Sequence, residues 1–290
     1  MEKSKDRRLV IGADGLIGRA LSAHLKSAGA AVIETTRKPD SVSDKRLFLD
    51  IAKDISDWQL PEHISVAYLC AAATSLVNCK KDPFHTKKIN VTNTVALARK
   101  LVEQGAFVVF PSTNLVFDGS VAFQKADYPA CPNTEYGRQK AEAEIQLLNL
   151  GESVATVRFT KILGLDTPLF KGWIEALRNN EIIHPFSDMV MSPVPLSSAV
   201  EVLYRIAEKR LSGIVQVSGK EDVSYEQAAY FIARGIGARK ELFQPVKSTE
   251  SGIDMEAAPL NTTLDTSRME SALGMMPPDI WKTIYNSIGI

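Results

Sequence analysis

Short apolar, β-branched runs alternate with longer stretches of helical periodicity through the first half of the chain. Apolar runs of about four to eight residues predict strands, and apolar residues three or four positions apart predict helices. The expected strands are 8–12, 31–35, 46–49, 65–70, 106–112 and 153–159. The clearest expected helices are 16–29, 86–104 and 136–150. Such alternation is typical of parallel βαβ units.

Some of the predicted strands lack polar alternation, and residues 106–110 are the clearest example. A strand of this kind is buried on both faces, as in a parallel sheet with helices on each side. We therefore expect an α/β fold, a Rossmann-like doubly wound parallel sheet with a smaller C-terminal substrate-binding lobe. Ligands of such a fold bind at the carboxyl ends of the strands.

The regular alternation fades after about residue 160, where several prolines interrupt the chain. We expect a dinucleotide-binding Rossmann domain over 1–160 and a smaller mixed α/β substrate-binding lobe over 161–290. The sequence leaves open whether the two parts are interleaved in space. In the second part the pattern predicts a strand within 213–219, a helix that starts near Ser224 and a last helix within 277–289.

Composition limits the classes of ligand. The 290 residues include 34 basic and 34 acidic side chains, so no net field attracts nucleic acid or an anionic membrane. Three cysteines without a CxxC motif or a paired histidine spacing predict reduced thiols and no metal site. No apolar stretch is long enough to span a bilayer, so we expect a cytoplasmic protein with a small-molecule ligand.

A glycine-rich turn follows the first predicted strand. Gly12 can take a positive-φ turn, Gly15 lets backbone approach a diphosphate, and Gly18 permits close contact between helix and strand. The predicted cofactor contacts of this turn are Gly12, Asp14, Gly15, Leu16, Ile17 and Gly18. Because the spacing differs from GxGxxG and such turns also occur without ligands, the assignment depends on the rest of the chain.

The end of the second predicted strand bears on the choice of cofactor. A fold that prefers NAD places an acid there to bind the ribose 2′-hydroxyl. Thr36 stands at that position, and Arg37 and Lys38 can meet a 2′-phosphate, so NADP is favoured over NAD. The alternative is Glu34, which would face the ribose and favour NAD if the strand ended two residues earlier.

Two further strand ends offer cofactor contacts. Asp50 and Ile51 end the third strand, where the carboxylate can accept a hydrogen bond from the adenine amino group or cap its own loop. Small side chains at the end of the fourth strand, Ala71, Ala72 and Ala73, leave room for a cofactor across the sheet edge.

Catalytic chemistry is indicated by Thr113 at the end of the fifth strand and by Tyr136 and Lys140, four residues apart on a predicted helix. An ammonium group beside a phenol lowers the pKa of the phenol from about 10, so we expect Tyr136 to exchange protons near neutrality. A tyrosine–lysine pair alone is a weak signal. Its place after the glycine turn and Thr113 is stronger, because that order brings a hydroxyl, a proton donor and a nicotinamide to one crevice.

In this order of motifs the chain resembles the extended short-chain dehydrogenase/reductase family over nearly its whole length. The matching motifs are the three turn glycines, 71–73, Asp82-Pro83, 89–91, Thr113 and the pair Tyr136 and Lys140. The motifs that are most similar to the dTDP-4-dehydrorhamnose reductase branch are 112–119, Ser192-Pro193, 264–268, Pro277-Pro278 and Trp281. That branch reduces the 4-keto group of a nucleotide-linked deoxysugar.

The resemblance implies roles for single residues. Thr113 would hydrogen-bond the substrate carbonyl, Tyr136 would donate a proton to it as hydride arrives from NADPH, and Lys140 would hold the ribose hydroxyls and tune the tyrosine. Asn90 would help to position the active-site helix. The expected contacts with the nucleotide-sugar substrate are Thr74, Asn114, Val116, Lys161 and Met191.

The chain departs from the branch pattern on the substrate side. Asn114 and Leu115 stand where the branch usually has Asp-Tyr, Val194 stands where a threonine usually follows Ser-Pro, and Lys161 stands where a tryptophan is usual. Lys161 can contact a phosphate or carboxylate of an altered substrate. The cofactor half is therefore better determined than the sugar.

Three other functions occur among proteins with similar motifs. Sugar-nucleotide dehydration needs an acid–base pair that Asn114 and Leu115 cannot supply. A C4 epimerase uses the same catalytic side chains. It generally keeps NAD as its cofactor, whereas Arg37 favours NADP. A non-catalytic NADP-binding regulatory subunit stays open, because one relative of the branch is the regulatory partner of methionine adenosyltransferase. The sequence also leaves a homodimer open.

Overall fold

The computed structural model describes residues 7–165, 167–250 and 259–289. Its main feature is one seven-stranded parallel sheet in the order β10-β6-β5-β4-β1-β2-β3. The strands are β1 (Arg7–Ile11), β2 (Ala31–Thr36), β3 (Arg46–Phe48), β4 (Ile64–Leu69), β5 (Phe107–Thr113), β6 (Val154–Phe159) and β10 (Gly213–Val217). The expected fold class is confirmed, and the six predicted N-terminal strands lie within about two residues of the observed ones.

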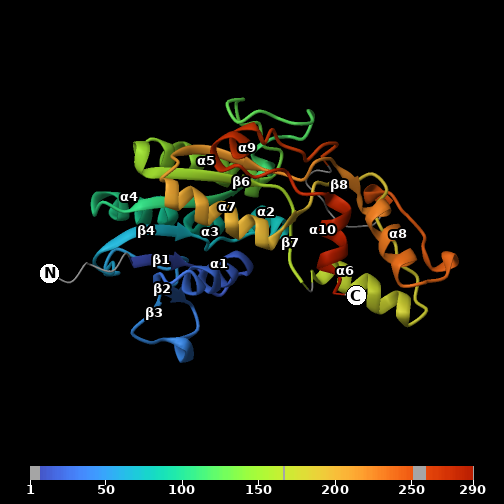
Figure 1. Cartoon of the computed structure of the whole chain (residues 1–290), viewed down its shortest axis with the longest axis horizontal. Coiled ribbons are helices and arrows are strands. Elements are labelled where there is room, and N and C mark those ends of the chain that lie inside the picture. The colour runs from blue at the N-terminus through green and yellow to red at the C-terminus, as the bar shows by residue number, and fades with distance from the viewer. Residues whose placement is uncertain (1–6, 166, 251–258, 290) are drawn as a thin grey trace.

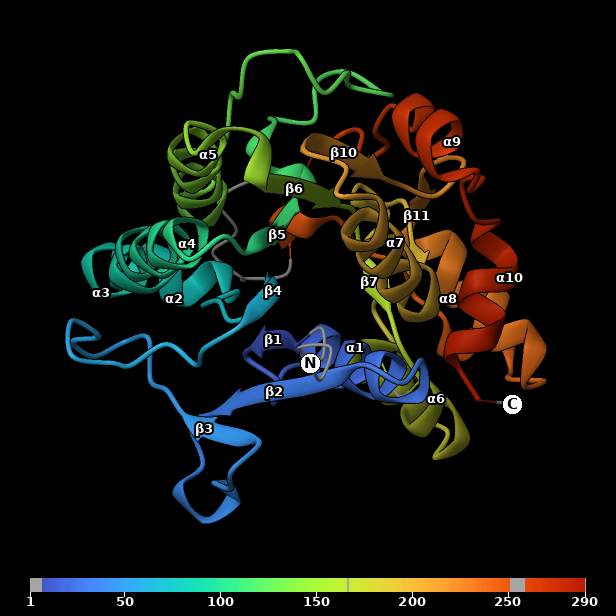
Figure 2. The same cartoon turned by 60° about the vertical axis from the view of Figure 1, so that its left-hand side comes forward.

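Helices cover both faces of this sheet (Figure 2). On one face α1 (Leu16–Ser27) and α7 (Leu196–Lys209) share a core with β1 and β10. On the other face α4 (Thr94–Glu103) and α5 (Glu135–Leu148) pack on β4 and β5. The strand order reverses between β1 and β4, so the crevice at their carboxyl ends is the expected ligand site.

The long helical segment before α4 differs in detail from the predicted helix over 86–104. It begins with α3 (Pro83–Lys87), whose first turn is capped by the Asp82 carboxylate accepting from the His85 N–H at 3.0 Å. A π-helical turn over Lys88–Asn93 then joins α3 to α4. The apolar periodicity predicted a continuous helix because a π turn adds a residue without interrupting the helical path.

A second core lies at one end of the sheet (Figure 1). It is formed by α6 (Pro168–Arg178), α8 (Tyr225–Gly235) and α10 (Ile280–Ser287), with Trp281 packed against Phe231 at 5.2 Å between ring centroids. Short strands connect it to the sheet: β7 (Ile162–Leu163) pairs with β9 (Val194–Pro195), and β8 (Val190–Met191) pairs with β11 (Val223–Ser224). The remaining helices are α2 (Leu76–Lys81) and α9 (Ser267–Leu273).

The two parts of the chain are interleaved in space. β10 extends the main sheet beside β6, and α7 covers one of its faces, although both lie beyond residue 160. The functional division at that residue stays a prediction. Within the described residues, no helix is both long and apolar enough to cross a membrane.

Candidate functional site

The turn after β1 is shaped by its glycines. Gly12 has a φ of 88°, and its N–H donates to the Thr35 hydroxyl at 2.9 Å. A Cβ on Gly12 would lie 2.6 Å from the Ala71 nitrogen, and one on Gly18 would lie 2.2 Å from the Gly12 carbonyl oxygen. Both positions therefore require glycine. Gly15 caps α1 and leaves space in front of the helix N-terminus, which is where a diphosphate is stabilised.

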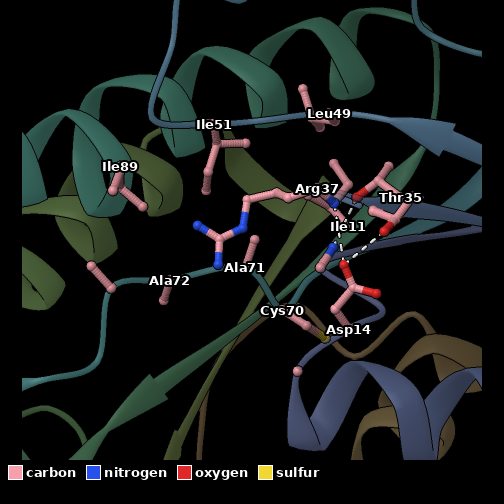
Figure 3. A pocket seen from close by; sticks show the side chains of 14 residues that line it. Ile11, Asp14, Thr35, Arg37, Leu49, Ile51, Cys70, Ala71, Ala72 and Ile89 are labelled. Atoms are coloured by element: carbon pink, nitrogen blue, oxygen red, sulfur yellow. Dashed lines mark hydrogen bonds between the residues drawn. The ribbon is translucent and has the colours of Figure 1, made fainter. Parts of the chain in front are cut away.

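A pocket of about 230 Å³ opens beside this turn, between the ends of β1, β2 and β4 (Figure 3). Nine of the predicted cofactor contacts line it: Gly12, Asp14, Gly15, Thr36, Arg37, Ile51, Ala71, Ala72 and Ala73. The side chain of Arg37 extends across the pocket toward Ala71. Lys38 and Asp50 do not line the pocket, and the Asp50 carboxylate accepts from the Ala52 N–H at 3.1 Å, which caps its own loop.

The alternative acid, Glu34, does not face this pocket. β2 continues to Thr36, so the strand does not end two residues early. The two oxygens of the buried Glu34 carboxylate pair with Lys26 at 2.5 Å and with Arg46 at 2.9 Å. The strand-end geometry thus favours Thr36 and Arg37 at the ribose position.

Another acid does lie in the pocket. The Asp14 carboxylate accepts from the Thr36 hydroxyl at 2.8 Å, from the Arg37 N–H at 3.2 Å and from the Arg46 guanidinium at 2.6 Å. Burial would raise the pKa of Asp14, but these hydrogen bonds outweigh it and hold the pKa below the usual value. Asp14 is therefore ionised at neutral pH.

A second, larger pocket of about 540 Å³ adjoins the first, and the two share Gly15, Cys70 and Ala72. It brings together Thr113 and Tyr136, the predicted hydroxyl and proton donor. It also contains these further residues that the sequence singled out: Leu16, Ile17, Thr74, Asn114, Lys161 and Met191. The two pockets thus meet at the switch point of the sheet.

Val116 is not at this pocket. It is fully buried in a small cluster with Phe117, Ala141 and Leu264. The prediction of a substrate contact is contradicted by this position, because Val116 lies in a short 3₁₀ turn, Asn114–Val116, that directs only its first residues at the pocket.

Helix α5 is brought against the end of β5 by a glycine. A Cβ on Gly137 would lie 2.1 Å from the Leu115 carbonyl oxygen. The Thr134 hydroxyl accepts from the Gly137 N–H at 3.0 Å and so caps the helix at the same point. This close approach brings Tyr136 to the pocket that Thr113 also lines, and sequence reasoning missed Gly137 because its contact is with a distant backbone atom.

Lys140 is buried behind the pocket. Its ammonium group donates to the Pro111 carbonyl oxygen at 2.7 Å and lies 3.6 Å from the Phe110 ring centroid. Burial lowers the pKa of Lys140 to about 7 and raises the pKa of Tyr136. The expectation that Lys140 lowers the pKa of Tyr136 is therefore wrong for this arrangement, because desolvation controls both groups.

Asn90 connects the pocket to the helices. It lies in the π-helical turn, and its side chain amide bonds to the backbone of Ala73 and to the Gln139 side chain, the latter at 2.8 Å. Gln139 in turn donates to the Thr86 hydroxyl at 3.0 Å. Sequence reasoning missed Gln139. The available signal was its place between Tyr136 and Lys140, the pair that matches the family.

Lys161 is the one charged side chain among the described residues that line the second pocket. It follows β6, and the surrounding protein displaces enough water to lower its pKa. Within the described chain its ammonium group has no hydrogen bond or ion pair. The buried Ser112 hydroxyl, also in the pocket, likewise has no hydrogen-bond partner there. The exposed Lys161 ammonium group is therefore available to a ligand.

No cluster of three or more metal-ligating His, Cys, Asp or Glu side chains occurs in the part of the chain that the structure describes. Cys70, Cys79 and Cys131 form no disulfide with one another.

Comparisons with known proteins agree with this architecture. The model of the RmlD substrate binding domain family matches residues 7–288. The dTDP-4-dehydrorhamnose reductase of Aggregatibacter actinomycetemcomitans is 27% identical over 296 residues, which cover 97% of both chains. Methionine adenosyltransferase 2 subunit beta of Pongo abelii is 26% identical over 302 residues, which cover 94% of this chain and 84% of that one. The dTDP-4-dehydrorhamnose reductase of Bacillus anthracis, solved with NADP, superposes with a TM-score of 0.83 at 21% identity and 98% coverage of both chains.

Proposed function

The chain belongs to the family of the RmlD substrate binding domain, and on that premise we propose that it is an NADP-dependent reductase of a nucleotide-linked keto-deoxysugar. The membership confirms the resemblance that the motifs indicated. The observation that carries the proposal is the junction of the two pockets, where a glycine turn suited to a diphosphate adjoins a crevice that holds Thr113 and Tyr136. The similarity to a curated 4-keto reductase supports the reaction class.

The first pocket fits the adenosine half of the cofactor. Gly12 and Gly15 would admit the diphosphate to the N-terminus of α1, and Ala71 to Ala73 would leave room along the end of β4. Thr36 and Arg37 would face the 2′-phosphate, as the end of β2 at Thr36 and their place in the pocket support, whereas Lys38 lies outside the pocket lining. Bound NADPH supplies the hydride for the reaction.

The chain's own residues would donate the proton and orient the substrate carbonyl. The Tyr136 phenol, which burial keeps protonated at neutral pH, would donate its proton to the substrate carbonyl oxygen as the carbonyl carbon accepts hydride. The Thr113 hydroxyl would hydrogen-bond the same oxygen and orient the carbonyl. Lys140 would hold the ribose hydroxyls with the N–H donors of its ammonium group that the Pro111 carbonyl does not use.

The second pocket would take the sugar. Thr74, Asn114 and Met191 line its walls, and Lys161 would pair with an anionic group of the substrate, a phosphate or a carboxylate. In this assignment residues 1–160 hold the cofactor, and residues 161–290 supply Lys161 and Met191 to the substrate.

The test is NADPH oxidation by the purified protein over a panel of 4-keto sugar nucleotides. Tyr136→Phe removes the proton donor and should lower kcat by about 10²–10⁴-fold. Tyr225→Phe is a matched control, because Tyr225 is a second tyrosine of the same pocket that has no assigned part in proton transfer, and it should keep most of the activity. Turnover of the panel that is equal in Tyr136→Phe and in the unchanged protein would contradict the assigned mechanism.

A second candidate is a regulatory subunit that binds NADP without turning over a sugar. It is favoured by the similarity to methionine adenosyltransferase 2 subunit beta, which spans 94% of this chain. Stable co-purification with a partner enzyme, NADPH binding and no oxidation of NADPH over the panel would support this candidate. Conversion of a nucleotide sugar to its C4 epimer without net oxidation of cofactor would instead indicate an epimerase.

A further inference from the structure

The acid that lies at the ribose position of the first pocket comes from the glycine turn. Asp14 lines the pocket and hydrogen-bonds Thr36 and the Arg37 backbone, the two residues that end β2 and follow it. Figure 3 shows its carboxylate beside the base of the Arg37 side chain. An NAD-binding fold has a carboxylate at this point in space, although it normally comes from the end of the second strand.

A free carboxylate there would oppose a 2′-phosphate. It would accept a hydrogen bond from a ribose 2′-hydroxyl and repel a phosphate, because like charges in a partly desolvated pocket are weakly screened. Arg37 favours the phosphate, so the pocket contains groups that favour either cofactor. The balance depends on how far the charge of Asp14 is neutralised.

Arg46 supplies that neutralisation. It extends from the first residue of β3, and its guanidinium bonds to Asp14 at 2.6 Å with one nitrogen and to Glu34 at 2.9 Å with another. Arg46 does not itself line the pocket. Lys26 provides Glu34 with a second cation at 2.5 Å, so Arg46 is not the only group that balances Glu34.

We infer that Arg46 is a specificity-determining residue of this chain: by pairing with Asp14 it lets the pocket accept a 2′-phosphate, and without it Asp14 would turn the pocket toward NAD. The inference rests on the cofactor class of the proposed function. Arg46 acts through Asp14 and is therefore a positioning residue. It lies 32 positions along the chain from Asp14, with no local pattern that links them.

Adenosine fragments test this inference without any catalysis. Isothermal titration with 2′,5′-ADP and with 5′-ADP gives the preference for the 2′-phosphate in four proteins: unchanged, Arg46→Met, Asp14→Asn and the double variant. In Arg46→Met the affinity for 2′,5′-ADP should fall about tenfold or more, while that for 5′-ADP stays within about threefold. In the double variant the preference should return, because Asp14 no longer repels the phosphate.

Three results would overturn the inference. They are an unchanged preference in Arg46→Met, an equal loss of both ligands, and a loss of 2′,5′-ADP that persists in the double variant. The last would mean that Arg46 contacts the phosphate directly. If the unchanged protein bound neither fragment, both the proposed cofactor site and the role of Arg46 would be wrong. The three results above would contradict only the role of Arg46.

Two variants separate selectivity from folding. Lys26→Met removes the other partner of Glu34 without touching Asp14, so it should lower thermal stability without changing the ligand preference. Arg46→Lys keeps the positive charge and should keep most of the preference for 2′,5′-ADP. A loss of preference in Lys26→Met equal to that in Arg46→Met would assign the effect to Glu34 and contradict the role of Asp14.

Discussion

Asn90 holds both backbone polar groups of Ala73: its Oδ1 atom accepts from the Ala73 N–H at 2.8 Å, and its Nδ2 atom donates to the Ala73 carbonyl at 2.9 Å. Ala73 follows β4 and lines the first pocket, whereas Asn90 lies in the π-helical turn. One amide side chain thus fixes the loop that borders the cofactor site to the helical layer behind it. Extra turns of this kind in helices often lie at functional sites.

Asn90→Ala should weaken both the fold and the cofactor site. It removes the partner of the Ala73 N–H and one of the two donors to the Ala73 carbonyl, which keeps the Cys79 thiol at 3.4 Å. A buried polar group left unpaired costs about 1–3 kcal/mol. We expect the free energy of unfolding to fall by about 2–4 kcal/mol in urea titrations. The affinity for NADPH, followed by nicotinamide fluorescence, should fall with it.

Thr94→Ala is the control for Asn90. Thr94 donates to the Ile89 carbonyl oxygen at 2.8 Å in the same helical segment but does not contact Ala73. It should lower stability and leave the NADPH affinity unchanged. A drop in NADPH affinity as large as that of Asn90→Ala would mean that the loop is not held specifically by Asn90.

Lys140→Met should change how stability depends on pH. The folded protein lowers the pKa of Lys140 from 10.5 to about 7, so the unfolded chain binds a proton more tightly and unfolding takes up protons between these values. Stability therefore rises with pH across this window, and the charged lysine costs most below about pH 7.

Removal of that buried charge should raise the free energy of unfolding at pH 7 by on the order of 1–3 kcal/mol, less the cost of leaving the Pro111 carbonyl unpaired. At pH 10 the gain should be much smaller. Urea titrations at both pH values measure this, and catalysis should be lost in the same variant. An equal effect at the two pH values would contradict the buried, weakly basic state of Lys140.

Lys161→Gln should weaken substrate binding selectively. A hydrogen bond to a charged group contributes about 1.5–3 kcal/mol, so the substrate KM should rise by about tenfold or more while NADPH affinity stays the same. Lys282→Gln, on the exposed face of α10, is the control and should change neither value. An unchanged substrate KM in Lys161→Gln would show that this lysine does not bind the substrate.

Gly137→Ala should disrupt the junction between α5 and β5. The added Cβ would lie 2.1 Å from the Leu115 carbonyl oxygen, a contact that backbone movement must relieve at about 1–3 kcal/mol. The shift would also move Tyr136 relative to Thr113 and lower kcat. Gly172→Ala on α6 meets nothing within 4 Å and should be neutral or stabilising, as measured by thermal unfolding.

The fold was predictable because its signals are local. The apolar runs gave the strands to within about two residues, and Gly12 and Gly18 reveal the turn because no other residue fits their surroundings. The same locality explains what was missed. Arg46, Gln139 and Gly137 act on groups far away in sequence, which no spacing rule connects.

The chemistry of the tyrosine–lysine pair shows the same limit. The spacing correctly placed Tyr136 and Lys140 on one helix. It could not indicate that the Lys140 ammonium group turns to Pro111, nor that burial raises the pKa of Tyr136. Desolvation depends on the whole fold, so the direction of a pKa shift is the property least accessible from sequence.

The position of β10 at the edge of the sheet has a consequence for how the protein is made. During synthesis β6 leaves the ribosome well before β10, so its outer edge and the apolar face that α7 later covers stay exposed until residues 196–217 have been added. A fragment that stops near residue 160 would keep that edge permanently. Truncation there should yield an aggregating chain rather than a small nucleotide-binding protein, since the sheet is completed only by the second half of the polypeptide.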